Sequence, residues 1–395
     1  MNPLSEPRPK DLLIVTRRFW PYSGLTEIAL AELAQNFQAF GHRVTIASLR
    51  WAKDWCEEFD FCGIRVVRFG RPVAGPWSSF RYSRALGRHL KLNDYDAVIV
   101  SGLGDEALTA TRTVNEETPV VLHIDEGFDG VFGSIHRKHI ETCLAADAVV
   151  ANSPAVASFL RGYSEMPELS VVPMGIRRSE NSIGPKVGRG EIRECLTKTH
   201  PVLRVERDQL LVVACSRMNH ECGLTQVVEA WPQVLRQTPG AKLWLIGEGR
   251  STGKVWESII KLDLAHSVIL PGNFDNLDEI FAAADLYVHA DGPSQTGDGL
   301  LRAMASGIPA VCVRNRWTSQ FIEHGRNGLL VDPSLSNADL WAKAVADAWS
   351  DEHWRSEAGR LAASTIGPQC LPQTQVNQYL ALLAKFSGRL LESAQ

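Results

Sequence analysis

Residues 285–311, which read DLYVHADGPSQTGDGLLRAMASGIPAV, contain the pattern around which the fold is organised. An apolar run at 285–289 predicts a buried strand, and 290–298 form a glycine-bearing loop ahead of a short helix that begins near Gly299. A second strand is predicted at 310–313. A strand, a glycine-rich loop and a helix in this order point backbone N–H groups beyond the carboxyl end of the strand. The stretch therefore predicts an anion site, although such turns are also ordinary in α/β proteins.

The same alternation of short apolar runs and helical segments extends along the chain in two blocks. Strands are predicted at 11–16, 43–47, 64–68, 96–101, 119–123, 147–151 and 169–173, and then at 210–215, 241–246, 267–270, 285–289, 310–313 and 328–331. Helices fill most of the intervals, which is typical of parallel, doubly wound sheets. The sequence therefore predicts an α/β fold with two Rossmann-like domains facing a cleft, where ligands bind beyond the carboxyl ends of the strands.

The length of 395 residues suits two domains. We expect an N-terminal acceptor domain at 1–180, a linker with room for one short helix at 181–206, and a C-terminal donor domain at 207–370. Apolar periodicity fades and glycines gather in the linker. Residues 371–395 predict a helix that could pack back on the N-terminal domain.

Composition narrows the class of protein. The formal net charge of −4 argues against a nucleic-acid partner, which needs a basic surface. No apolar run approaches the ~20 residues of a membrane span, and the polar segment 1–10 does not resemble a signal peptide. The 8 cysteines form no CxxC pair, so we expect reduced thiols in a cytoplasmic protein and no zinc site.

Several motifs, taken in order, resemble one large family. The stretch 211–224, LVVACSRMNHECGL, resembles a strand followed by Gly-Arg and then by Lys-Gly at a helix start. Residues 243–249 (LWLIGEG), 268–273 (VILPGN) and 303–311 (AMASGIPAV) resemble later turns of the family, with weaker matches at 325–330 and 171–176. Together they resemble the group 1 family of retaining glycosyltransferases, which have the GT-B fold and use nucleotide sugars.

The resemblance implies a donor site, mainly on the C-terminal domain. Arg217 matches an arginine that contacts the diphosphate, Gly24 a glycine close to the donor phosphates, and His123 a histidine near the transferred sugar. The implied catalytic set is His123, Arg217 and Gly297, and the implied donor-binding set is Gly24, Arg217, Gly247, Glu248, Gly272, Asn273, Ser294, Gly297, Asp298, Gly299 and Arg302. Backbone amides and cations can stabilise a leaving diphosphate without a metal. We therefore expect no metal and no cofactor beside a UDP- or GDP-linked donor.

Four positions depart from the family pattern. Cys222 replaces a lysine at the phosphate site, and Leu25 replaces the second glycine of the N-terminal turn. Ser294 and Arg302 replace two glutamates, of which the first would hold the donor sugar and the second the nucleotide ribose. Arg302 could take over a phosphate or ribose contact, because an arginine fork suits phosphate at least as well as lysine does. Alternatively, the donor chemistry has been lost.

The acceptor side is less well defined by the sequence. Asp125 and Glu126 could orient an acceptor hydroxyl or cap the next segment. Arg81, Arg84 and Arg88 share one predicted helical face, which suits either an anionic lipid surface or solvent. We assign Asp125, Glu126 and Arg81 to an acceptor set and expect a saccharide, lipid-linked or small-molecule acceptor, with peripheral membrane contact as one option.

The function favoured by these patterns is transfer of a sugar from a nucleotide sugar to an acceptor hydroxyl, with retention and without a metal. The alternative is a catalytically silent GT-B relative that binds a nucleotide or sugar or acts as a scaffold. Trp51, Trp55 and Trp77 either line an acceptor groove or pack loops.

Overall fold

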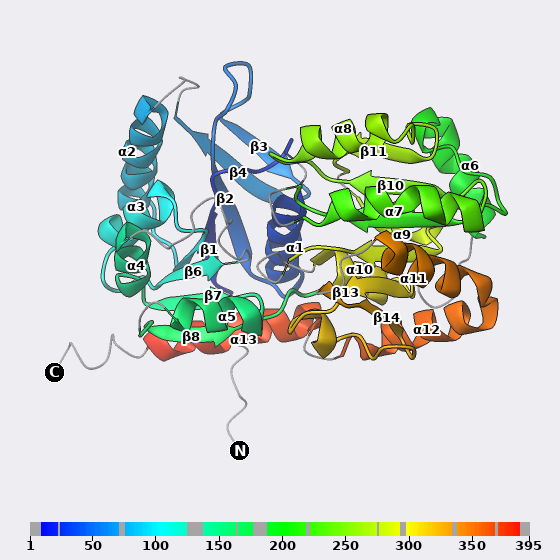
Figure 1. The fold of residues 1–395 in the computed structure, drawn as a ribbon. Helices are drawn as coiled ribbons and strands as arrows, with labels where there is room; N and C mark the ends of the chain where they lie inside the picture. Colours follow the sequence, from blue (N-terminus) through cyan, green and yellow to red (C-terminus); the bar gives the residue numbers. More distant parts are fainter. Residues whose placement is uncertain are drawn as a thin grey trace.

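The computed structural model describes residues 9–22, 24–70, 76–124, 137–162, 165–176, 188–218, 222–274, 276–292, 298–333, 338–367 and 370–387. These residues form two α/β domains side by side, each built on a sheet with helices on both faces (Figure 1). The predicted fold class, two Rossmann-like domains, is confirmed.

The N-terminal domain is built on an 8-stranded sheet in the order β3-β4-β2-β1-β5-β6-β7-β8. Its strands are β1 (Asp11–Val15), β2 (Arg43–Leu49), β3 (Glu58–Phe61), β4 (Ile64–Phe69), β5 (Ala97–Ser101), β6 (Val120–Ile124), β7 (Ala148–Ala151) and β8 (Glu168–Val171). Neighbouring strands pair in parallel, except that β3 and β4 are antiparallel. The central strands β1, β5 and β6 are apolar throughout most of their length because helices bury both of their faces.

Two groups of helices cover this sheet. Helices α1 (Leu25–Ala39) and α13 (Pro372–Ser387) cover one face, where the rings of Phe37 and Tyr379 pack edge to face. Over the other face lie α2 (Pro76–Leu92), α3 (Asp105–Thr113), α4 (Arg137–Leu144) and α5 (Pro154–Arg161).

The C-terminal domain is built on a 6-stranded parallel sheet in the order β11-β10-β9-β12-β13-β14. Its strands are β9 (Leu211–Cys215), β10 (Lys242–Ile246), β11 (Val268–Gly272), β12 (Leu286–His289), β13 (Ala310–Val313) and β14 (Gly328–Val331). Helices α7 (Leu224–Gln237), α8 (Thr252–Lys261) and α11 (Ala338–Ser350) cover one face. The other face carries α9 (Asp278–Ala283), α10 (Asp298–Ala305), α12 (Glu352–Thr365) and the short 3-10 turn η4 (Thr318–Gln320).

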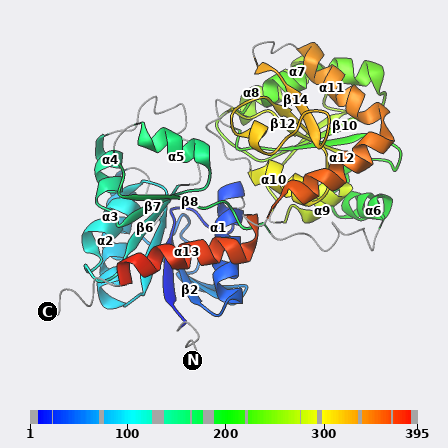
Figure 2. The same cartoon turned by 90° about the horizontal axis from the view of Figure 1, so that it is seen from below.

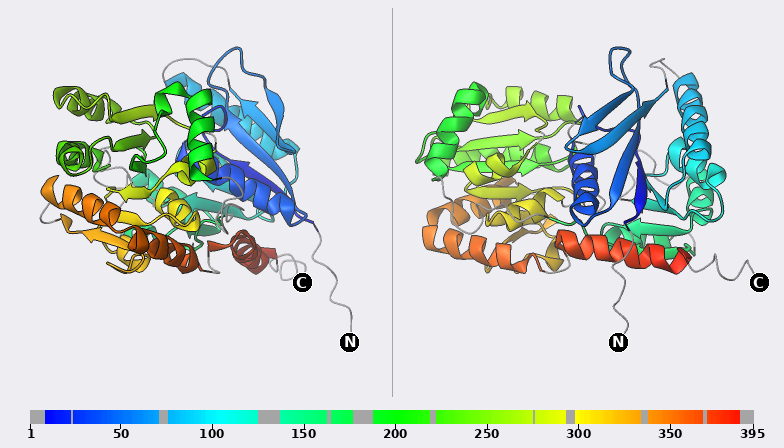
Figure 3. Two further views of the ribbon diagram at one scale, coloured as in Figure 1. Left: turned by 90° about the vertical axis from the view of Figure 1, so that its right-hand side faces the viewer. Right: turned by 180° about the vertical axis from the view of Figure 1, so that it is seen from behind.

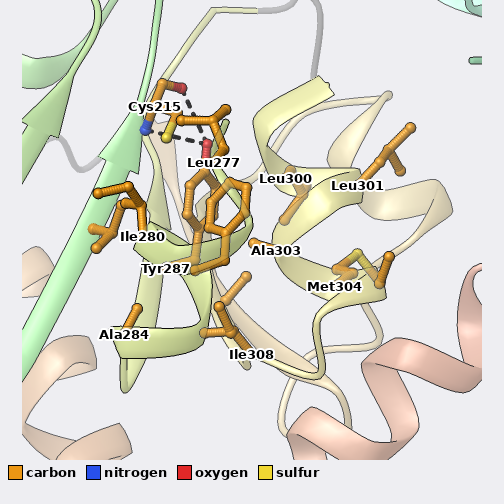
Figure 4. Close-up of a cluster of buried hydrophobic side chains, with 14 of the residues drawn as sticks. Cys215, Leu277, Ile280, Ala284, Tyr287, Leu300, Leu301, Ala303, Met304 and Ile308 are labelled. Carbon is orange, nitrogen blue, oxygen red and sulfur yellow. Dashed lines mark hydrogen bonds between the residues drawn. The ribbon is translucent and has the colours of Figure 1, made fainter. Parts of the chain in front are cut away.

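Helix α10 is seated on an apolar core that fixes its position. Figure 4 shows its side chains facing those of α9 and β12, with Leu277, Ile280, Tyr287, Leu300, Ala303, Met304 and Ile308 in the cluster. The Tyr287 hydroxyl donates to the Cys215 carbonyl oxygen at 3.0 Å, so the end of β9 is held against β12 (Figure 4). The start of α10 is thereby fixed over the carboxyl end of the sheet.

The segment predicted as a linker contains a helix that packs on the C-terminal domain. Helix α6 (Arg189–Thr199) and the 3-10 turn η3 (Pro201–Leu203) follow one another there. The buried Arg193 guanidinium pairs with Asp285 at 2.7 Å and donates to the carbonyl oxygen of Ala283. Because Asp285 also accepts from the N–H of Leu211, α6 is hydrogen-bonded to the base of this sheet.

The two domains share a core at the place where the chain crosses between them. The Ile176 N–H donates to the Cys370 carbonyl oxygen at 2.7 Å, so the two crossings lie side by side. Leu25 and Ile28 of α1 pack against the C-terminal core, which also includes Met174. Beyond the second crossing, α13 runs back along the N-terminal domain (Figures 2 and 3). Helix α1 therefore stands at the boundary between the domains.

Each sheet has one point at which the strand order reverses. In the N-terminal sheet it lies between β1 and β5, and in the C-terminal sheet between β9 and β12. Ligands of open α/β sheets bind beyond the carboxyl ends of the strands at such a switch point. We therefore expect the ligand-binding site in the loops that follow these four strands.

Candidate functional site

Arg217 lies in the loop directly after β9, at the C-terminal switch point. Two backbone hydrogen bonds join this loop to the end of β10 and to the loop after it. The Ser216 N–H donates to Ile246 O at 3.0 Å, and the Met218 N–H donates to Glu248 O at 3.2 Å. Arg217 itself is half-buried. Arg217, which is predicted to bind the diphosphate, therefore lies at the carboxyl edge of the sheet on a loop that these hydrogen bonds hold in place.

The predicted donor-binding turns after β10 and β11 lie against the Arg217 loop. Gly247 has a φ of 123°, and a Cβ there would lie 2.0 Å from the Ser216 carbonyl oxygen. The Gly247 N–H donates to the Gly272 carbonyl oxygen at 2.9 Å. Glu248 is exposed and Asn273 is half-buried. A carboxylate oxygen of Glu248 lies close to the α-carbon of Gly272. The four residues predicted for these turns are thus brought together.

The start of α10 closes the site from the β12 side. Asp298 is buried, and a Cβ on Gly299 would lie 2.3 Å from the Tyr287 hydroxyl oxygen. Glycine at 299 therefore allows α10 to approach the sheet closely. The predicted site residues Ser294 and Gly297 lie outside the described residues.

Asp291 is a buried acid at this switch point that the sequence did not single out. The Ser216 hydroxyl donates to its carboxyl group at 2.6 Å, and the group is 3% exposed. Burial raises the pKa of Asp291 to about 8, against the lowering effect of the Ser216 hydrogen bond. His289, whose Nδ1 lies 3.9 Å from Asp291, has a pKa lowered by burial to about 4. Both groups are therefore neutral near pH 7.

Cys222 stands near the start of α7, where the family pattern has a lysine. Its side chain is buried, and burial raises the pKa of the thiol. The thiol therefore stays protonated near neutral pH and is not an activated nucleophile. The predicted phosphate site therefore has no cation at position 222.

Arg302 reaches across the domain boundary. Its two terminal nitrogens donate to the two carboxylate oxygens of Glu32 on α1, at 2.6 and 2.7 Å. Burial lowers the pKa of Arg302, but the charge of Glu32 and its hydrogen bonds outweigh burial and raise that pKa overall. The sequence offered no sign of this partner, which is 270 residues away. A direct contact between Arg302 and the nucleotide stays a prediction.

On the N-terminal side, His123 is the next-to-last residue of β6 and is held by the C-terminal helix. Its Nδ1 lies 2.5 Å from the Tyr379 hydroxyl of α13, and the ring is buried. The helix that returns from the C-terminal domain thus orients the predicted catalytic histidine. Asp125 and Glu126, which follow it, lie outside the described residues.

The N-terminal switch point carries two arginine–glutamate pairs that the sequence did not reveal. Arg17 lies 3.5 Å from Glu106 at the start of α3, and Arg18 lies 3.7 Å from Glu27 at the start of α1. Both carboxylates fold back over their own helix starts, since a Cβ on Gly24 or on Gly104 would lie within 2.4 Å of one of them. Negative charge is stabilised at a helix N-terminus. The start of α1, where Gly24 was predicted to meet a phosphate, therefore carries a carboxylate of its own.

Aromatic rings surround these arginines. Arg18 lies 4.5 Å from the ring centre of Tyr22, which packs against Trp51 and Trp55. The Trp51 indole donates to the Arg17 carbonyl oxygen at 3.0 Å, and the residue is 37% exposed. Trp51 and Trp55 thus pack against the loop after β1 and remain partly exposed to solvent. The side chain of Trp77 lies outside the described residues.

Arg81, Arg84 and Arg88 lie on the outer face of α2 and are exposed. Tyr82, Leu86 and Leu90 of the same helix are buried in the core. The predicted basic face is therefore exposed, while Tyr82 on the buried side of the helix donates to the Thr16 carbonyl oxygen after β1 at 3.1 Å.

Among the described residues, no group of three histidine, cysteine or acidic side chains is placed to hold a metal ion. The search for a membrane-crossing helix over the same part of the chain finds none that is long and apolar enough.

Comparison with known proteins gives a consistent result for both domains. Residues 197–364 match the family model of glycosyl transferases group 1, and residues 26–180 match that of glycosyltransferase family 4. A lipopolysaccharide core biosynthesis glycosyltransferase, LpsE of Rhizobium meliloti, is 25% identical over 60% of this chain and 64% of its own length. A GDP-mannose-dependent phosphatidylinositol monomannoside mannosyltransferase of Mycobacterium tuberculosis is 25% identical over 86% of this chain and 89% of its own.

The chain spans less than two thirds of the first relatives that it matches. The share is 64% for LpsE and 47% for an alpha-monoglucosyldiacylglycerol synthase of Streptococcus pneumoniae.

Solved structures show the same architecture. Sucrose-phosphate synthase of Thermosynechococcus elongatus has a TM-score of 0.76 at 16% identity, covering 98% of this chain and 100% of that one. HepE of Anabaena, in complex with UDP-glucose, has a TM-score of 0.73 at 17% identity, covering 95% and 100%. Two Rossmann-like domains with adjoining switch points are thus the GT-B architecture of glycosyltransferases. Each of the two domains matches a family model of glycosyltransferases, family 4 for the N-terminal domain and group 1 for the C-terminal domain.

Proposed function

We propose that the protein transfers a sugar from a UDP- or GDP-linked donor to an acceptor hydroxyl, with retention and without a metal ion. The observation that carries the proposal is the C-terminal switch point, where Arg217 and the turns of Gly247 and Gly272 lie on adjoining loops. A cation and backbone amides on fixed loops can stabilise the charge that develops on a leaving diphosphate. No protein nucleophile is required if that phosphate accepts the proton of the acceptor hydroxyl on the same face.

The proposed donor contacts follow the family pattern residue by residue. Arg217 binds the diphosphate, and Gly297 and Gly299 offer backbone amides to the phosphates and sugar. His123 lies near the transferred sugar, with its ring oriented by Tyr379. Asp291 is compatible with an anionic ligand because its raised pKa keeps it neutral near pH 7.

The proposed acceptor is a saccharide, lipid-linked or small-molecule hydroxyl compound bound on the N-terminal domain. Asp125 and Glu126 stay in the proposed acceptor set. The exposed arginines of α2, including Arg81, would suit an acceptor in an anionic membrane surface. Two of the relatives are named for lipid products or substrates, a diacylglycerol glycoside and a phosphatidylinositol mannoside. All of the relatives named above are transferases or synthases, which favours an enzyme over a silent binding protein.

The test is calorimetric titration of UDP and GDP into the wild type and into Arg217→Ala. Loss of a charge-assisted contact should weaken binding of the preferred nucleotide roughly 10- to 100-fold. The matched control is Arg236→Ala, an exposed arginine in the last turn of α7, which should bind as the wild type does. Equal affinity in the wild type and Arg217→Ala would remove Arg217 from the site, and absence of binding by the wild type would refute the proposal.

A further inference from the structure

The ion pair between Glu32 and Arg302 joins α1 to α10 and is not among the proposed donor contacts. Both terminal nitrogens of Arg302 engage Glu32, one on each carboxylate oxygen. The Arg302 side chain is 9% exposed and the Glu32 side chain 21% exposed. Glu32 lies one turn beyond Ile28, which packs against the C-terminal core from the same face of α1. The carboxylate is therefore held at the domain boundary with part of its surface open.

The position of this pair relates it to the donor site. The charges of Asp298 and Asp278 both act on Arg302. Asp298 begins α10, directly after the predicted phosphate loop, and Asp278 begins α9, shortly after the turn of Gly272 and Asn273. If the base of a nucleotide lies at the turn of Gly272 and Asn273 and its phosphates lie at the predicted phosphate loop, its ribose lies between these two segments. Arg302 lies on α10 one turn beyond Asp298, and the charges of both Arg302 and Glu32 act on Asp278 at the start of α9.

The chemistry of Glu32 suits a ribose. A carboxylate offers about four acceptor positions, and Arg302 uses one on each oxygen. Within the described part of the chain, those are the hydrogen bonds that Glu32 accepts. In Rossmann-like domains a carboxylate beside the phosphate site commonly binds the ribose hydroxyls. A carboxylate fixed by a bidentate arginine needs no further ordering to do so.

We propose that Glu32 accepts hydrogen bonds from the ribose hydroxyls of the donor nucleotide and that Arg302 is the residue that positions it. The proposal rests on the proposed function, because it requires a nucleotide between the domains. It makes an acid of the N-terminal domain part of the donor site, although most of the proposed donor contacts are on the C-terminal domain. Donor binding then depends on the contact between α1 and α10.

The test measures whether the contribution of the ribose hydroxyls to nucleotide binding depends on Glu32. The dissociation constant of the preferred nucleotide, UDP or GDP, is compared with that of its 2′,3′-dideoxy analogue in the wild type, in Glu32→Gln, and in the double variant Glu32→Leu/Arg302→Met. The double variant replaces a buried ion pair by apolar side chains of similar volume, which folded domains commonly tolerate. Circular dichroism and thermal melting identify which variants are folded, and Glu32→Gln keeps the shape of the side chain if the double variant unfolds.

In the wild type, removal of the hydroxyls should weaken binding roughly tenfold or more, and in the folded double variant less than about threefold. Glu32→Gln keeps one acceptor oxygen in its amide, so its loss should lie between these two values. The control is Glu357→Leu/Arg360→Met, an exposed bidentate pair on α12, which should keep the full hydroxyl dependence of the wild type. An equal loss in the wild type and the Glu32 variants would overturn this proposal while leaving the proposed function standing. A wild type that binds neither UDP nor GDP would overturn both.

Discussion

At the residue scale, Asp291 is a carboxyl group beside a predicted diphosphate site, and its protonation decides whether it repels an anion. Its pKa of about 8 lies above the ordinary value of 3.8 because the group is buried. Between these two pH values the folded protein holds a proton that the unfolded chain has lost. The contribution of Asp291 to stability must therefore fall as pH rises through this window, by at most about 1.4 kcal/mol per pH unit.

Asp291→Asn should remove this dependence, because the amide is neutral at every pH and can still accept from Ser216. Urea unfolding at pH 5 and pH 8 measures the effect. We expect the wild type to lose more stability than Asp291→Asn between pH 5 and pH 8. The control is Asp347→Asn, which changes an exposed acid of α11 and should have the same pH profile as the wild type. Parallel profiles for the wild type and Asp291→Asn would show that Asp291 is ionised when folded.

The residues that sequence reasoning missed share one physical property: their roles come from partners far along the chain. Glu32 gains its role from Arg302, and Asp291 from burial beside Ser216. A motif identifies a residue by its neighbours in sequence, so it could place Arg217 and the glycine turns in the loops that follow β9, β10 and β11. It carried no information on which acid would meet Arg302.

At the element scale, the turn after β10 determines how closely the Arg217 loop and the turn of Gly272 and Asn273 approach each other. Gly247 lies in a backbone region that other residues rarely adopt, and its α-carbon faces the Ser216 carbonyl. Gly247→Ala should destabilise the protein by more than about 1–3 kcal/mol, because strain and a steric clash act together. It should also weaken nucleotide binding in variants that remain folded.

The matched control is Gly253→Ala in α8, where an added Cβ meets nothing within 4 Å. That change should be neutral or stabilising by up to about 1 kcal/mol, because alanine favours a helix. Thermal and urea unfolding of both variants measure the difference. Equal stability of the two variants would mean that the turn at Gly247 is free to rearrange.

Element types were predictable where burial produces a simple pattern. Most of the parallel strands are short runs rich in apolar residues, and each predicted strand is present. Strand β3 was not predicted because its four residues, EFDF, are half exposed and pair at the sheet edge. Helix α6 was expected only as one short helix in a linker, since its attachment to the C-terminal domain depends on the buried Arg193–Asp285 pair.

At the scale of the whole molecule, the domains are joined by more than the covalent crossings. Leu25 and Ile28 of α1 enter the C-terminal core, and Asn36 donates to Gln375 at 3.4 Å beside the second crossing. Tyr379 of α13 then contacts His123. Each domain thus supplies groups that orient residues of the other, which the domain pattern in the sequence could not show. The two-domain fold itself was predictable from the strand–helix alternation.

The central claim is that this two-domain site transfers a sugar from a nucleotide sugar. The most direct measurement is release of nucleoside diphosphate from a panel of UDP- and GDP-sugars, with water, saccharides and lipid extracts offered as acceptors. The account predicts release from at least one donor, loss of that release in Arg217→Ala, and a product that keeps the anomeric configuration of the donor. No release from any donor by a wild type that binds the nucleotide, or a product of inverted configuration, would contradict it.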